Sequence, residues 1–211
     1  LRSRQIPIGE QIALNTTKYL PENADTLIKR AVVKIVADFD NGDGFGTGWV
    51  VARQKDKLYI ITNRHVVVDQ NTHEQSKNIQ IRLYFGNLPN GTEAPGLPAK
   101  ISQIILPNQP LDLALLEVED LRLPQDIRPL PMASQSAQDN MPVSLVDNDV
   151  HRSIKKGKLI DIEDNLLTLE INAEPENSGS PILNANNEVI GVGFKAFTVQ
   201  GISQTTNGYA F

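Results

Sequence analysis

The sequence predicts an all-β protein made of two halves with similar numbers of strands. From Ala31 onward, short runs of β-branched and aromatic residues are separated by Gly, Asn, Asp and Pro, which is the pattern of many short strands joined by turns. A polar segment with several prolines, residues 121–137, interrupts these runs as a linker between two compact units would. Helical and extended patterns do not alternate, which disfavours a parallel α/β sheet. Two sets of about six strands fit a pair of β-barrels.

The expected strands divide evenly between the two halves. The first half contains the candidate strands 31–39, 45–53, 57–62, 79–85, 99–106 and 113–118. The second half contains 143–146, 153–162, 166–171, 181–183, 188–195 and 207–211. Ahead of them, weak helical spacing broken by Pro21 predicts an N-terminal arm with a short helix. The resulting boundaries are an arm at 1–30, a first barrel at 31–120, a linker at 121–137 and a second barrel at 138–211.

The composition argues against several classes of function. The net charge of −5 comes from acidic and basic residues mixed along 211 residues, so no basic block could neutralise a run of phosphates, and nucleic acid is not an expected partner. No apolar run approaches the roughly 20 residues that cross a bilayer, so no membrane span is expected. The absence of cysteine excludes disulfides, thiolate zinc sites and cysteine nucleophiles.

Neither a metal nor a cofactor is expected. The acidic turn at residues 38–44 has glycine at an expected calcium-ligand position, and no glutamate follows at the required place. No pair of histidines has the helical spacing of a zinc site. The chemistry of this chain is therefore expected to require no metal and no cofactor.

The strongest local feature is the segment PENSGSPIL at 175–183, where Ser178 stands in a tight glycine-containing turn just before a strand. A serine hydroxyl is a poor nucleophile at neutral pH, so it needs a base within hydrogen-bond reach and a third group that orients the base. Of the three histidines, His65 directly follows an apolar strand, whereas His73 and His151 lie in polar surroundings that indicate solvated residues. We therefore expect His65 to be the base.

The third group is expected to be Asp112, in the segment QPLDLALLEV. This lone carboxylate opens an otherwise apolar strand, and a carboxylate in such a place needs a partner because burying an unpaired charge is costly. An imidazole can be that partner. The sequence thus predicts a nucleophile, base and orienting acid at Ser178, His65 and Asp112.

The local sequences TNRHVV, DLALLEV and NSGSP resemble the three catalytic motifs of trypsin-like serine peptidases, and most closely those of bacterial HtrA (DegP-like) proteases. The order His65, Asp112, Ser178 is the order of that family's triad. The segments GTGWVV, EVIGVGF and NGYAF resemble further strands of the family, so the resemblance spans residues 31–211. It implies a chymotrypsin-like fold of two six-stranded antiparallel β-barrels, and a serine endopeptidase that works through an acyl-enzyme.

The resemblance also implies how a substrate is held. The oxyanion hole would be formed by the segment Glu176, Asn177 and Ser178, with the backbone amides of Glu176 and Ser178 facing the oxyanion. Other residues would contact the peptide: an edge for pairing with its backbone is implied at Phe194, Lys195 and Ala196, and an S1 pocket at Asn172, Ala173 and Gly208. A neutral, small to medium P1 side chain is expected, because Asn172 stands near the position of trypsin's specificity aspartate.

One position departs from the family pattern, since Glu176 replaces a glycine of the oxyanion hole. Glutamate keeps the backbone amide but lacks the freedom of glycine to turn it toward an oxyanion. Two alternatives to an active peptidase therefore stay open. One is a module that binds extended peptides without cleaving them, and the other is a latent protease that a neighbouring domain activates.

The expected partners are a protein or peptide substrate and a regulatory domain or partner outside this chain. Because the sequence begins at Leu1 and has no signal-peptide pattern, we expect an upstream segment to have been removed. The resemblance favours a periplasmic or other extracytoplasmic location, and a cytoplasmic one stays open.

Overall fold

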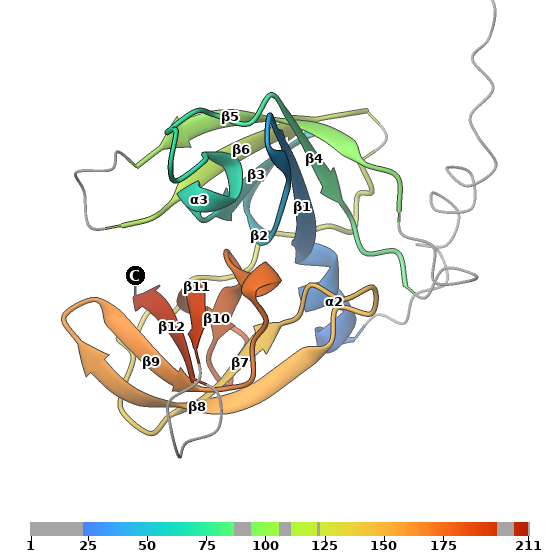
Figure 1. Cartoon of the computed structure of the whole chain (residues 1–211). Helices are drawn as coiled ribbons and strands as arrows, with labels where there is room; N and C mark the ends of the chain where they lie inside the picture. The colour runs from blue at the N-terminus through green and yellow to red at the C-terminus, as the bar shows by residue number, and fades with distance from the viewer. Residues whose placement is uncertain (1–22, 87–93, 106–110, 122, 198–204, 211) are drawn as a thin grey trace, which may run out of the picture.

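Two closed barrels of six antiparallel strands each form the body of the chain in the computed structural model (Figure 1). The structure describes residues 23–86, 94–105, 111–121, 123–197 and 205–210. The strands of the first barrel lie within residues 32–119, and those of the second lie within residues 142–210. The expected all-β double barrel is confirmed.

The first barrel is closed in the order β1-β2-β3-β6-β5-β4. Its strands are β1 (Val32–Phe39), β2 (Gly42–Gln54), β3 (Lys57–Thr62), β4 (Asn78–Arg82), β5 (Leu97–Ile104) and β6 (Ala114–Glu119). Alternate residues point inward, as in β3, where Leu58 and Ile60 are fully buried. They pack in one cluster with residues such as Ile35, Ile81 and Leu116.

The second barrel repeats this architecture in the order β10-β11-β12-β9-β8-β7. Its strands are β7 (Pro142–Val146), β8 (Ile154–Glu163), β9 (Leu166–Glu170), β10 (Pro181–Leu183), β11 (Val189–Phe197) and β12 (Thr205–Ala210). A separate cluster that includes Leu145, Leu159, Leu167, Leu169 and Ile182 fills its interior. Each barrel therefore has its own core.

Each expected strand has a counterpart in the structure, but several ends differ. The strand expected at 79–85 ends at Arg82, although Leu83 and Phe85 beyond it are still buried in the first core. Their apolar side chains extend the strand pattern in the sequence, while the backbone has already left the ladder. The strand expected at 188–195 continues instead to Phe197.

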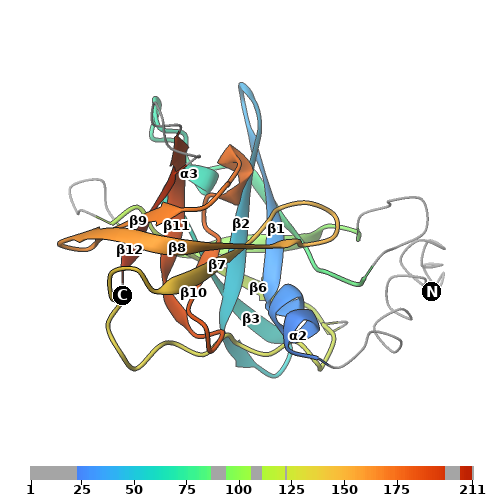
Figure 2. The same cartoon turned by 90° about the horizontal axis from the view of Figure 1, so that it is seen from below.

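The short helix expected in the N-terminal arm is α2 (Ala24–Ala31), which starts after an Asn23 cap whose side chain accepts a hydrogen bond from the Thr26 amide. Its Ile28 belongs to a third apolar cluster that joins the barrels, with Trp49 from the first and Leu183 from the second. Figure 2 shows α2 next to β1. The helix thus packs where the two barrels meet.

Two short helical turns position His65 and Ser178 of the predicted site. The first, α3 (Arg64–Val67), follows β3 directly and carries His65. The second, the 3₁₀ turn η3 (Pro175–Asn177), leads into Ser178. Figure 1 shows α3 on the side of the first barrel that faces the second. In the described residues, no helix has both the length and the apolar character needed to cross a membrane.

Candidate active site

His65 and Asp112 are brought together by the pairing of β3 with β6. Thr62 at the end of β3 lies opposite Ala114 at the start of β6, so the residues just beyond these two positions are neighbours. The Arg64 amide donates to the Asp112 carbonyl oxygen at 3.1 Å, and the Asn63 side-chain amide donates to the same oxygen at 2.9 Å. The backbone at Asp112 is therefore fixed against the start of α3.

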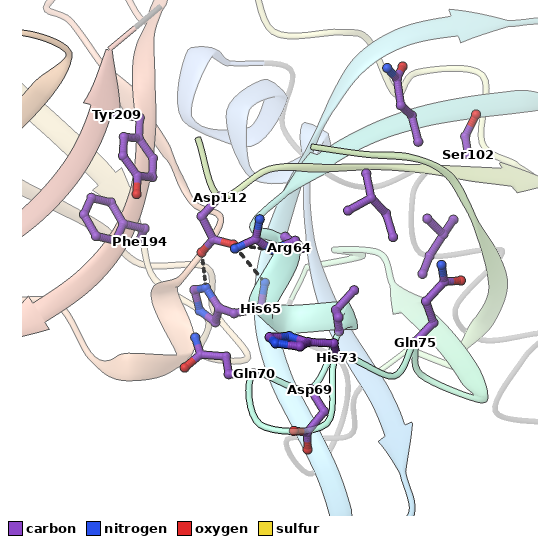
Figure 3. Close-up of a pocket in the computed structure, with 14 residues that line it drawn as sticks. Arg64, His65, Asp69, Gln70, His73, Gln75, Ser102, Asp112, Phe194 and Tyr209 are labelled. Carbon is purple, nitrogen blue, oxygen red and sulfur yellow. Dashed lines mark hydrogen bonds and ion pairs between the residues drawn. The ribbon is translucent and has the colours of Figure 1, made fainter. Parts of the chain in front are cut away.

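The carboxylate of Asp112 faces the imidazole of His65 (Figure 3). One carboxylate oxygen contacts His65 Nδ1, and the other accepts the His65 backbone amide at 3.1 Å and lies 3.6 Å from Arg64 Nε. The side chains of His65 and Asp112 are only 21% and 15% exposed, so water screens this pair poorly.

The pKa of Asp112 reflects this environment. Burial on its own raises the pKa, but the hydrogen bonds and charge of His65, together with the charge of Arg64, outweigh it and hold the pKa of Asp112 below its ordinary value. The carboxylate is thus ionised near neutral pH. As an acceptor, it favours the imidazole tautomer that carries a proton on Nδ1 and has Nε2 as its acceptor.

Ser178 sits in a turn that only glycine can complete. Gly179 has a φ of +90°, and a Cβ atom there would clash with the carbonyl oxygen of Thr47. The Gly179 amide donates to the Gly193 carbonyl oxygen at 2.8 Å, which ties the turn to β11. The Thr47 amide donates in turn to the Ser178 carbonyl oxygen at 2.8 Å. Both barrels therefore hold the backbone of Ser178.

The hydroxyl of Ser178 lies 3.0 Å from the Pro175 carbonyl oxygen and 3.3 Å from the Phe194 carbonyl oxygen. The Ser178 amide also donates to the Pro175 carbonyl oxygen, at 3.2 Å. In the part of the chain that the structure describes, His65 is not a hydrogen-bond partner of this hydroxyl. Two of the three predicted residues are therefore in contact, while Ser178 is turned toward the backbone of its own loop.

The segment predicted to form the oxyanion hole is a closed turn in this structure. The Asn177 amide donates to the Glu174 carbonyl oxygen at 2.9 Å, and the Ser178 amide donates to the Pro175 carbonyl oxygen. Glu176 is exposed, whereas Asn177 is 3% exposed. An oxyanion would have to compete with the Pro175 carbonyl oxygen for the amide of Ser178.

A pocket of about 960 Å³ lies beside His65 and Asp112 (Figure 3). Its apolar lining includes Val68 and Ile101 from the first barrel, and Phe194 and Tyr209 from the second. The rings of Phe194 and Tyr209 are stacked, with centroids 4.2 Å apart and planes 12° apart. Burial raises the pKa of Tyr209, and the negative charge of Asp112 raises it further against a smaller opposing effect of Arg64.

The residues predicted to bind substrate lie in different surroundings. Phe194 lines the pocket, Asn172 is exposed, and Ala173 is 4% exposed in the core of the second barrel. Gly208 lies on β12 opposite Gly193. A Cβ atom added to Gly208 would clash with the side chain of Ile182. The side chains of Lys195 and Ala196 lie outside the described part, although their backbone belongs to β11.

The backbone edge predicted at Phe194, Lys195 and Ala196 belongs to β11, which has a different strand on each side. β12 pairs with β11 along one side as far as Phe197, whereas β10 pairs on the other side only with Val189, Gly191 and Val192. Among the described strands, none pairs with this second side beyond Val192. An extended peptide could add to the sheet there.

Sequence reasoning missed two residues that support the site, Arg64 and Thr47. Arg64 lies beside the Asp112 carboxylate, and its Nη1 donates to the Ile105 carbonyl oxygen at 3.1 Å. The Thr47 hydroxyl donates to the Glu176 carbonyl oxygen at 2.9 Å. Arg64 could have been found, because it precedes His65 in the TNRHVV motif. Thr47 lies in the GTGWVV segment, but its contact could not be predicted there, since its partner Glu176 is far away in the sequence.

A family model described as a trypsin-like peptidase domain matches residues 46–192. Among solved structures, the crystal structure of the serine endoprotease from Yersinia pestis is similar, with a TM-score of 0.65 and 18% identity over 90% of this chain and 63% of that one. The present chain thus spans less than two thirds of that protein. The crystal structure of the Rv3671c protease in an inactive form has a TM-score of 0.63 and 22% identity over 88% of this chain and 85% of that one. At these identities, the likeness shows a shared fold.

Proposed function

This chain belongs to the family of trypsin-like peptidase domains, and from that premise we propose that it is a serine endopeptidase that cleaves peptide bonds through an acyl-enzyme intermediate. The observation that carries the proposal is the contact of His65 with the ionised Asp112 in a pocket that Phe194 also lines. The Ser178 hydroxyl lies 3.3 Å from the carbonyl oxygen of that same Phe194. A serine hydroxyl is activated when an imidazole that a carboxylate orients can accept its proton.

In the proposed reaction, the Ser178 hydroxyl oxygen attacks the carbonyl carbon of the scissile peptide bond. His65 Nε2 accepts the hydroxyl proton and later gives it to the leaving amine. Asp112 keeps the imidazole oriented and stabilises its positive charge while it holds that proton. A water molecule then hydrolyses the acyl-enzyme, with His65 again serving as the base.

We propose that the substrate is an extended peptide paired with the backbone of Phe194, Lys195 and Ala196. The ladder of β11 with β12 leaves the other side of this segment without a partner among the described strands. Main-chain hydrogen bonds on such an edge give affinity with little dependence on sequence. Asn172, Ala173 and Gly208 would then border the P1 side chain, and their lack of charge favours a neutral one.

A second candidate function is a latent peptidase, and the Pro175 carbonyl oxygen is the observation that favours it. This oxygen accepts from both the amide and the hydroxyl of Ser178. For catalysis, the peptide unit between Pro175 and Glu176 would have to rotate, so that the Glu176 amide replaces this oxygen beside the serine. A substrate or a regulatory partner that stabilises the rotated state would switch the enzyme on.

Labelling with a fluorophosphonate probe tests the proposal without knowledge of the substrate, because the probe reacts with activated serines. The wild-type chain should be labelled, Ser178→Ala should not, and His65→Ala should be labelled at least about 100-fold more slowly, since it lacks the base. Ser134→Ala is a matched control at an exposed position and should behave like the wild type.

The outcomes separate the two candidates. Labelling of the wild type that depends on Ser178 and His65 supports an enzyme that is active by itself. Labelling that appears only when peptides are added supports the latent form. Labelling that persists in Ser178→Ala would reject the assignment of the nucleophile.

A further inference from the structure

We propose that Asn148 is a positioning residue for Ser178: its side-chain amide holds the Glu176 carbonyl and so fixes the orientation of the loop that carries the nucleophile. The inference rests on the proposed peptidase function. Asn148 lies in the 147–153 loop, which joins β7 to β8 in the second barrel. It is 3% exposed, and neither a motif nor the spacing of residues in the sequence singled it out.

The side chain of Asn148 bridges the two barrels at residues 174–180, the serine loop that carries Ser178. Its Nδ2 donates to the carbonyl oxygen of Gly46 on β2 and to that of Glu176 on η3, each at 3.1 Å. The backbone amide of Asn148 donates to Asn177 Oδ1, also at 3.1 Å. One residue therefore contacts two consecutive residues just before Ser178 and anchors them to the first barrel.

The Glu176 carbonyl has both of its acceptor positions filled. Besides Asn148 Nδ2, the Thr47 hydroxyl donates to it at 2.9 Å. Thr47 is itself fixed, because its carbonyl oxygen accepts from the Thr62 hydroxyl at 2.7 Å and its amide donates to Ser178. A carbonyl with two buried donors cannot rotate without losing both hydrogen bonds.

This arrangement divides the serine loop into a fixed part and a part that can turn. The fixed part begins at the Glu176 carbonyl and continues through Ser178, whose own carbonyl accepts from the Thr47 amide at 2.8 Å. The preceding carbonyl, that of Pro175, accepts only from groups of Ser178 in the described residues. The peptide unit between Pro175 and Glu176 can therefore turn while Asn148 and Thr47 hold Ser178 in place.

Asn148 can act as an anchor because its own loop is braced. The Asp149 carboxylate accepts from the amides of His151 and Ser153 and from the Ser153 hydroxyl, the last at 2.6 Å. The guanidinium of Arg152, a residue that is 4% exposed, donates to the carbonyl oxygens of Asp149 and Arg82. These contacts tie the 147–153 loop to itself and to the first barrel.

The polar atoms around Asn148 also argue for positioning over simple packing. Asn148 Oδ1 and Asn177 Nδ2 are buried and have no hydrogen-bond partner among the described residues. Such atoms reduce stability, so an apolar side chain would be better suited to a site that served packing alone. Their other polar atoms instead join the 147–153 loop to the residues before Ser178, since Asn148 Nδ2 donates to the Glu176 carbonyl oxygen and Asn177 Oδ1 accepts from the Asn148 amide.

Because Asn148 does not line the pocket, its loss should lower kcat and leave KM nearly unchanged. Asn148→Asp keeps the shape but replaces the donor by a carboxylate that faces two carbonyl oxygens. We expect kcat for a peptide substrate to fall at least about 10-fold with KM within about twofold, since misplaced oxyanion donors cost transition-state binding.

Amide hydrogen exchange at residues 174–180 should become faster, while exchange around His65 stays as in the wild type. Asn184→Asp, the same change in the turn between β10 and β11, is the control.

Further variants keep the proposal falsifiable. Asn148→Ala removes the donor without adding a charge, and should show the same fall in kcat if Asn148→Asp does not fold. Thr47→Val removes only the second donor to the Glu176 carbonyl and should also lower kcat. Thr47→Ser keeps the hydroxyl and should have a kcat close to that of the wild type. Asn148 variants that fold and keep kcat within about twofold of the wild type, with unchanged exchange at 174–180, would overturn the proposal. A wild type that stays inactive even with added peptides would count against the peptidase function alone, because the exchange measurement would still decide the role of Asn148.

Discussion

The Pro175 carbonyl oxygen lies 3.0 Å from the hydroxyl oxygen of Ser178 and 3.2 Å from its amide nitrogen. One carbonyl oxygen thus accepts hydrogen bonds from both the hydroxyl of the proposed nucleophile and one amide of the predicted oxyanion hole. The two groups must be released together, since a single rotation of the peptide unit between Pro175 and Glu176 moves this oxygen away from both. In the proposed reaction, catalysis therefore requires release of the Pro175 carbonyl.

Glu176→Gly should increase the rate of fluorophosphonate labelling. Glycine reaches backbone conformations that a glutamate reaches only with strain, so the rotated peptide unit becomes easier to populate. We expect at least about a 10-fold faster reaction, which corresponds to about 1.4 kcal/mol in favour of the rotated state. The labelling rate is measured at a fixed probe concentration for both proteins.

Glu174→Gly is the matched control for this experiment, because it makes the same replacement in the same exposed loop, two residues upstream. It should leave the labelling rate close to that of the wild type. Equal acceleration in both variants would indicate general loosening of the loop. No acceleration in Glu176→Gly would mean that the carbonyl of Pro175 does not limit the activity.

Asp112→Asn should abolish most of the activity while the fold is kept. An asparagine side chain can hold the imidazole in the wrong tautomer, with the proton on Nε2 and no base facing the serine. We expect kcat to fall by about 10³ to 10⁴. Steady-state hydrolysis of a peptide substrate measures this loss, and Asp139→Asn at an exposed position provides the control.

The same substitution should change how stability depends on pH. The pKa of Asp112 is lower in the folded protein than its ordinary value, so the ionised carboxylate stabilises the fold above the unfolded pKa of roughly 3.9. That contribution is lost as the pH falls through the lower pKa of the folded state. The difference in unfolding free energy between wild type and Asp112→Asn should therefore shrink as urea denaturation is repeated from pH 7 down to pH 3. A difference that stays constant over this range would contradict the assignment.

Gly179→Ala should destabilise the protein strongly. The backbone at Gly179 has a φ of +90°, and a Cβ atom there would clash with the Thr47 carbonyl, which is held by Thr62. Strain and steric conflict together should cost about 3 kcal/mol or more in urea denaturation. Gly42→Ala is the control, because its φ is +132° but no atom lies within 4 Å of the added carbon, so only the smaller cost of strain applies. Equal losses in the two variants would show that the clash is relieved by movement of Thr47.

The strands and the His65–Asp112 pair could be predicted from the sequence because their signals are local. The run Leu58, Tyr59, Ile60 and Ile61 is apolar and rich in β-branched and aromatic residues, which is sufficient to identify β3. Asp112 stands out as a charge before an apolar strand, and that strand pairs with the one preceding His65. The contact between them follows once both strands are in the same barrel.

The state of the serine loop could not be predicted, because long-range contacts determine it. The Glu176 carbonyl is fixed by Thr47 and Asn148, and these three residues are far apart in the chain. The direction of the Pro175 carbonyl depends on a single peptide rotation, which leaves no pattern in the sequence. Glu176 was recognised as unusual from its position alone, but its exposure and the closed turn around it required the structure.

The edge of β11 offers the most direct test of how a substrate is bound. If a peptide pairs with the backbone at Phe194, Lys195 and Ala196, then alternate residues of the peptide direct their amides toward β11, and the residues between them direct theirs away. N-methylation at one position of a cleaved peptide should therefore lower kcat/KM by at least about 10-fold, since it removes a hydrogen bond and adds a methyl group inside the ladder. N-methylation at the next position should have an effect of about twofold or less.

The measurement is a series of peptides methylated one residue at a time on the acyl side of the scissile bond. A period of two in the losses supports pairing with β11, whereas losses that depend only on distance from the scissile bond would mean that the peptide is held by its side chains.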